Sequence, residues 1–288
     1  MYAPSTVGSF LRSFTWGHTL QLEAAARDVL AALAARTPLL PGADEVTFVD
    51  VDSLLRRVYG AGKQGARFGH AKVGGYRVSL RGLSPLIAAI STPRSAPVVA
   101  ATRLRGGNAG SARAAAPLVT QAILTARQAG GSGQILVRAD SAFCSGTVLS
   151  ACRRAGANFS VTTTVNTKVH TAIDTITEDA WTPVAYPGAV FDDEAGVWIS
   201  DAQVAETIYT AFASTRHKVT VRLVVRRVRE LNPAPEGQEE LFPIWRYHAF
   251  ITDTELSTVE ADLTHRQHAI IEQLFADLID GPLAVVRR

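Results

Sequence analysis

Two aspartates stand two positions apart at the end of an apolar run, residues 46–52 (VTFVDVD). Side chains two apart on a β-strand project from the same face, so Asp50 and Asp52 share one. Asp140 repeats this arrangement directly after a second apolar run, residues 134–139 (QILVRA). If the two strands are neighbours, the acids converge at one edge of the sheet. Carboxylates gathered there suit Mg²⁺ or Mn²⁺, although a single strand-end aspartate more often caps the next turn.

The last predicted helix, residues 258–279, offers a third acid. On a continuous helix His265, His268 and Glu272 lie at i, i+3 and i+7 and share a face. Glu272 then borders an apolar stripe, where an acid can enter a cleft. Two alternatives remain open. Glu272 is a solvated surface residue, or the three side chains bind a transition metal by themselves, without the HExxH spacing.

Basic residues are unevenly distributed along the chain. The totals are 29 Lys and Arg against 26 Asp and Glu, a net charge of +3. From residue 53 to residue 173, however, there are sixteen basic residues and one carboxylate, that of Asp140. Such a block indicates a surface that meets a polyanion, nucleic acid above all, although a coding bias toward Arg and Ala is an alternative. The best-placed candidates for binding phosphate follow the first acidic strand: Arg56, Arg57, Lys63, Arg67 and Lys72.

The composition excludes several protein classes. A chain of 288 residues with 47% hydrophobic and 19% charged residues is typical of a globular protein. No apolar run approaches the roughly 20 residues that span a bilayer, and the N-terminus lacks the pattern of an export signal. Cys144 and Cys152 have neither CxxC nor metal-site spacing. We expect a reduced, cytoplasmic protein without a membrane partner.

The order of elements predicts an α/β protein. An amphipathic helix at 20–35 precedes the strand at 46–52, and a Gly-rich basic loop covers 60–75. The predicted strands are followed by helices at 111–129, 147–155 and 258–279. Short β-like runs separated by Pro, Gly and acidic loops fill the stretch before the last helix. The predicted domains are a helical segment at 1–45, a core at 46–165 and 250–288, and a β-rich insertion at 166–249.

Several separated motifs resemble one family. TFVDVDSLLRRVYG, LRGGNAGSARAA, ILVRADSAF, WRYHAFITD and HRQHAIIEQLFADLIDG occur in this order. Together they resemble the catalytic domain of DDE-type transposases of bacterial insertion sequences, and the resemblance extends from about residue 5 to residue 281. It implies a ribonuclease H-like mixed sheet flanked by helices, with a β-rich insertion between the second aspartate and the glutamate helix.

The resemblance also implies roles for the acids. The triad would be Asp52, with Asp50 as a near-equivalent candidate, then Asp140 and Glu272. Such a triad holds two Mg²⁺ or Mn²⁺ ions for DNA strand cleavage and strand transfer. The implied partners are the insertion-sequence ends and the target DNA, bound by a homodimer, with the basic residues and His265 and His268 on DNA phosphates.

The chain also departs from the family pattern. Family members often carry Tyr, Arg and Lys around the glutamate, at spacings that here fall on His265, His268 and Ile279. They also usually have more sequence at both ends, which predicts a truncated copy. Two alternatives to an active enzyme therefore stay open. One is a truncated, non-catalytic DNA-binding remnant; the other is a basic globular domain whose acids only cap turns.

Overall fold

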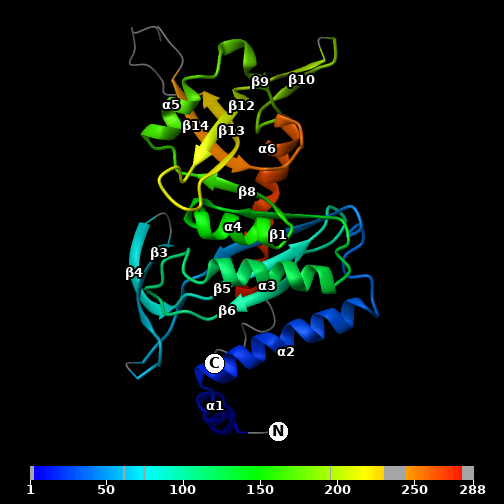
Figure 1. Cartoon of the computed structure of the whole chain (residues 1–288). Coiled ribbons are helices and arrows are strands. Elements are labelled where there is room, and N and C mark those ends of the chain that lie inside the picture. Colours follow the sequence, from blue (N-terminus) through cyan, green and yellow to red (C-terminus); the bar gives the residue numbers. More distant parts are fainter. Residues whose placement is uncertain (1–2, 61, 74–75, 195, 230–243, 281–288) are drawn as a thin grey trace. The chain divides into compact units, whose positions relative to one another are not determined.

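The computed structural model describes residues 3–280 except residues 61, 74–75, 195 and 230–243. The described chain divides into two compact units. Unit 1 comprises residues 3–136, 151–157 and 271–280, and unit 2 comprises residues 137–150 and 158–270. Each unit has its own strands and helices (Figure 1).

The sheet of unit 1 has the strand order β6-β5-β1-β7. Strand β1 (Val46–Ser53) pairs antiparallel with β5 (Leu86–Ser91), which pairs antiparallel with β6 (Val98–Arg103). Strand β7 (Gln134–Ala139) follows β1 in this order, and its first three residues belong to unit 1. The Gly133 amide donates to the Ala43 carbonyl and the Gln134 amide to the Glu45 carbonyl, so β1 and β7 begin at the same end and run parallel.

Helices cover this sheet. Helix α3 (Ala115–Gln128) packs on β5, β6 and β1, and α2 (Trp16–Ala34) contacts β6 and α3 (Figure 1). Residues 47–51 and all of β5 are buried, as expected for strands covered on both faces. The other helices with residues in this unit are α1 (Pro4–Arg12), the end of α4 (Gly146–Arg154) and α7 (Ile270–Asp280).

Unit 1 also carries a small three-stranded sheet with the order β2-β4-β3, made of β2 (Arg56–Arg57), β3 (Arg67–Val73) and β4 (Tyr76–Leu83). Backbones approach one another closely at its base. A Cβ atom on Gly69 would collide with the Gly107 carbonyl, and one on Gly82 with the Arg56 carbonyl. A Cβ atom on Gly107 would meet the carbonyls of Arg67 and Gly82. We call Gly69, Gly82 and Gly107 the glycine junction, because the absence of side chains lets the segments cross there.

Unit 2 contains the strand order β8-β14-β13-β12-β9, antiparallel at each of these pairs. Helix α6 packs on β12 and β13, and α5 packs on β12. A capping box begins α6: Ser257 accepts from the Glu260 amide, and the Glu260 carboxylate accepts from the Ser257 amide. The elements are β8 (Asn158–Thr163), α5 (Thr167–Ile173), β9 (Thr182–Pro183), the hairpin β10 (Val190–Asp192) and β11 (Val197–Ile199), β12 (Ala202–Ala211), β13 (Val219–Arg229), β14 (Trp245–Thr252) and α6 (Thr258–Arg266).

The predicted fold class is confirmed. The molecule is α/β, with a mixed sheet flanked by helices, β-rich sequence between Asp140 and α7, and an arrangement consistent with a ribonuclease H-like core. Strands β1 and β7 are neighbours, as predicted. Among the described residues, no helix combines the length and apolar character needed to cross a membrane.

Two local predictions are wrong. The predicted loop at 60–75 contains β3, which pairs with β4 along its whole length. The predicted helix at 258–279 is two helices, because a 3₁₀ segment at Gln267–Ala269 separates α6 from α7. Residues 230–243 of the predicted insertion and 281–288 of the predicted core lie outside the described residues.

Candidate active site and nucleic-acid interface

The first acid pair lies at the carboxyl end of β1. Asp50 is completely buried, whereas Asp52 is half-buried and accepts a hydrogen bond from the Ser53 amide at 2.6 Å. In the antiparallel register Asp50 is opposite Ala89 and Asp52 is opposite Ile87. Directly opposed residues point to the same side of a sheet, so both carboxylates share a face with these two residues.

Helix α7 covers that same face. Ile271 and Phe275 of α7 form a buried cluster with Ile87, and Leu54 packs against it. Glu272 follows Ile271 directly and is exposed. Unit 1 therefore brings the Asp50–Asp52 pair and the helix that carries Glu272 to one face of its sheet.

Asp140 follows β7 and is described within unit 2. Its carboxylate accepts from the Ala142 amide at 2.9 Å and so caps the 3₁₀ turn at Ser141–Phe143. Its side chain keeps contact with solvent, yet the surrounding protein desolvates it enough to raise its pKa; the Ala142 amide and the charge of His268 partly oppose this shift. Asp140 therefore both caps this turn and experiences the charge of His268.

His265 is held on both sides of its ring. Its Nδ1 lies 2.8 Å from the Ser160 hydroxyl and its Nε2 lies 2.9 Å from the Thr162 hydroxyl. The ring also stacks on Phe250, with centroids 4.1 Å apart. Since these contacts engage both nitrogens, they favour a structural role for His265 over a contact with DNA.

The prediction that His265, His268 and Glu272 share a helix face assumes that residues 258–279 form one helix, which the structure divides. The 3₁₀ segment at Gln267–Ala269 interrupts the periodicity between His265 and Glu272. Within the part of the chain that the structure describes, no group of three or more His, Cys, Asp or Glu residues is placed to hold a metal ion.

The predicted phosphate-binding residues lie on or beside the small sheet β2-β4-β3. Arg57 and Arg67 are exposed and both stand opposite Gly82, so they share a side of this sheet. The Arg57 guanidinium lies over the Tyr59 ring, 4.7 Å from its centroid. Lys63 is exposed, Arg56 is half-buried, and Lys72 occupies β3 opposite Arg77.

Sequence reasoning missed the second side of this sheet. Phe68 is 67% exposed and stands opposite Arg81, while the exposed His70 stands opposite Ser79. The sequence does contain a signal for this sheet. Gly74-Gly75 stands between two runs of alternating side chains, a pattern typical of a β-hairpin.

Unit 2 buries an arginine between two tryptophans. The Arg227 guanidinium lies 4.3 Å from the ring centroids of both Trp181 and Trp245. Its nitrogens donate to both Glu178 carboxylate oxygens, at 2.8 and 2.7 Å, and to Gln203 at 2.7 Å. These rings therefore serve the packing of unit 2.

Comparison with known proteins adds one finding. The family model described as Transposase DDE domain group 1 matches residues 6–236. The matched region contains Asp50, Asp52 and Asp140 and ends before Glu272. The search of curated proteins gives no significant match.

Proposed function

The chain belongs to the DDE transposase domain family, and from that premise we propose that it cleaves and transfers DNA strands of an insertion sequence with divalent metal ions. The observation that carries the proposal is the acid pair Asp50–Asp52 on the sheet face that α7 covers. Asp140 follows the strand beside β1, which supports its convergence with that pair.

The donor set fits hard cations. Asp52, Asp140 and Glu272 would hold two Mg²⁺ or Mn²⁺ ions, with Asp50 as the alternative first ligand. Bound ions supply activation of the attacking water or 3′-hydroxyl and stabilisation of the leaving oxygen. The Ala142 amide would keep the Asp140 carboxylate oriented.

A thermal melt across a Mg²⁺ titration tests this site, beside a nicking assay on supercoiled plasmid. We expect wild-type stability to rise with the logarithm of metal concentration and the plasmid to be nicked. Asp140→Asn and Asp52→Asn should remove both effects, and Asp50→Asn should do less if Asp52 is the ligand. A melt indifferent to both Mg²⁺ and Mn²⁺, or normal nicking by Asp140→Asn, contradicts the proposal.

A non-catalytic, DNA-binding remnant is the second candidate. It would still bind DNA and metal, so metal stabilisation without nicking favours it over the enzyme. The proposed partners are insertion-sequence ends and target DNA, held by a homodimer in the cytoplasm. We keep the predicted domains as proposals: 1–45, then 46–165 with 250–288, and 166–249.

The small sheet β2-β4-β3 is the proposed surface that binds DNA phosphates. His268, whose charge acts on Asp140, is a further proposed phosphate contact. Charge reversal of Arg56, Arg57 and Lys63 together should weaken duplex binding similarly for all sequences. It should also flatten the dependence of log K on log salt by about 0.9 per lost contact. Charge reversal at the exposed Arg153 and Arg154 of α4 is the control. An unchanged slope of log K against log salt in the triple variant counts against phosphate binding by this sheet.

A further inference from the structure

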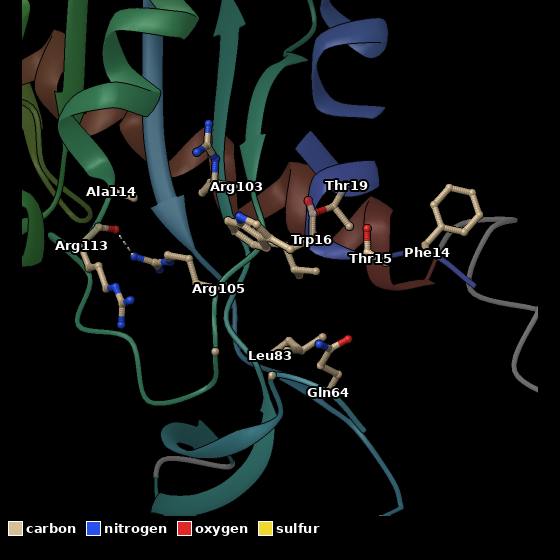
Figure 2. Close-up of a pocket in the computed structure, with 13 residues that line it drawn as sticks. Phe14, Thr15, Trp16, Thr19, Gln64, Leu83, Arg103, Arg105, Arg113 and Ala114 are labelled. Carbon is tan, nitrogen blue, oxygen red and sulfur yellow. Dashed lines mark hydrogen bonds between the residues drawn. The ribbon is translucent and has the colours of Figure 1, made fainter. Parts of the chain in front are cut away.

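A pocket of about 610 Å³ lies within unit 1 (Figure 2), and neither Asp50 nor Asp52 is among its lining residues. The start of α2 provides Trp16 and Thr19, and the end of β4 provides Leu83. Three arginines also line the pocket: Arg103, Arg105 and Arg113. No carboxylate is among the lining residues.

Arg105 brings a buried charge to this pocket. It is 7% exposed and donates to the carbonyls of Ser84, Gly110, Ser111 and Arg113 and to the Ser84 hydroxyl. All these partners are uncharged, and in the described part of the chain the guanidinium has no carboxylate partner. Burial, and secondly the charge of Arg113, lower the pKa of Arg105. A buried cation beside a second cation is costly unless an anion compensates it.

Arg113 leaves donors available for such an anion. Its side chain is exposed and forms no hydrogen bond or ion pair with other described residues. Arg103 differs, because its Nε lies 3.1 Å from a Glu23 carboxylate oxygen. The positive charge without a counter-charge is therefore that of Arg105 and Arg113.

An aromatic surface stands beside these charges. Trp16 is 52% exposed, and Figure 2 shows its indole directed toward the arginines, with Phe14 directed away. Half-buried Leu83 and Leu104 add apolar surface. The site does not depend on free amides at the start of α2, because Thr15 and His18 form a capping box there.

We propose that this pocket binds one unpaired nucleotide of a DNA strand, with the phosphate at Arg105 and Arg113 and the base against Trp16. A planar base stacks on indole regardless of its identity, and arginine is suited to phosphate oxygens. The inference rests on the proposed function only in taking DNA as the ligand.

Fluorescence anisotropy of a labelled, short 5′-phosphorylated oligothymidine on the full chain tests the pocket. Trp16→Ala should weaken binding about 5- to 100-fold, whereas Trp16→Phe keeps an aromatic ring and most of the affinity. Arg113→Gln should weaken it about tenfold. The matched control is Arg154→Gln, an exposed arginine of α4 that undergoes the same loss of charge. Neither Arg113 nor Trp16 anchors the loop as Arg105 does.

Competition separates a nucleotide from a bare anion. Thymidine 5′-monophosphate should displace the oligonucleotide far better than inorganic phosphate or thymidine. No binding by wild type, equal losses in Arg113→Gln and Arg154→Gln, or equal competition by inorganic phosphate overturns the pocket proposal. Failure of the catalytic proposal is read separately, from nicking by Asp140→Asn, because that residue lies outside this pocket.

Discussion

Asp52 and Ile87 are direct cross-strand partners in β1 and β5, so a half-buried carboxylate stands beside the aliphatic side chain on which α7 packs. The packing of α7 on the sheet and the position of Asp52, the first candidate metal ligand, are therefore coupled through the pair Asp52–Ile87. Packing at Ile87 fixes which surface of α7 meets the sheet, and Glu272 adjoins that surface.

Truncation of the Ile271 side chain should weaken the packing of α7 on the sheet. Ile271 is 1% exposed and packs with Ile87, so Ile271→Ala should lower the free energy of unfolding by about 2–5 kcal/mol. Ile271→Val should cost only about 0.5–1.5 kcal/mol. Urea denaturation of the three proteins measures both. Equal stability of the two variants would show that α7 does not depend on this contact.

Asp140 should make stability depend on pH in a defined direction. Because the fold raises its pKa, folding favours the protonated acid. The stabilisation linked to that proton is complete below the ordinary aspartate pKa and is lost as pH rises through the raised value. Without metal, Asp140→Asn should therefore melt at or above the wild-type temperature at pH 7, since asparagine keeps the acceptor for the Ala142 amide. A clearly lower melting temperature at pH 7 would falsify this account.

Arg227 should not tolerate lysine. The change removes a planar group that stacks on Trp181 and Trp245 and binds Glu178 through two nitrogens. We expect a loss of about 1–3 kcal/mol in the free energy of unfolding, with a change in tryptophan emission. Arg246→Lys, at an exposed position of β14, should be nearly neutral. Identical unfolding curves for the two variants would contradict the role assigned to Arg227.

The glycine junction should be sensitive to a single methyl group. Gly107→Ala places a Cβ atom against the Arg67 and Gly82 carbonyls, which are backbone atoms that cannot turn away. We expect a cost of about 1–3 kcal/mol in unfolding free energy. Gly110→Ala is the matched control in the same loop, because a Cβ atom there meets nothing within 4 Å. The idea fails if the two alanine variants denature together.

Sequence alone was sufficient where local pattern and tertiary environment agree. The runs ending at Asp52 and Asp140 were predicted as strands because continuous apolar β-formers bounded by turns have few other stable arrangements. Their adjacency is an expectation for an α/β sheet, and the strand order confirms it. The acid pair on one face of β1 required only the two-residue repeat of a strand.

The incorrect predictions concern segments whose structure depends on contacts with residues that are distant in sequence. Nothing local interrupts residues 258–279, yet α6 buries Ala261 against Val224 and Phe250, while α7 buries Ile271 against Ile87. Each helix follows its own packing partners, which a periodicity cannot reveal. The DNA contact of His265 is implied only by its spacing from Glu272 in the family pattern. The positions of Ser160 and Thr162, which the sequence does not reveal, show that both ring nitrogens are engaged.

The glycine junction also has a genetic consequence. Every amino-acid change that a point mutation can make in a glycine codon introduces a residue with a Cβ atom, conservative or not. At Gly69, Gly82 and Gly107 that atom would fall on a neighbouring backbone, so no gradual route of substitution leads away from these positions. Copies of this gene that drift without selection should therefore lose the small sheet β2-β4-β3 through such codons, whereas the codon of Gly110 can change without that effect.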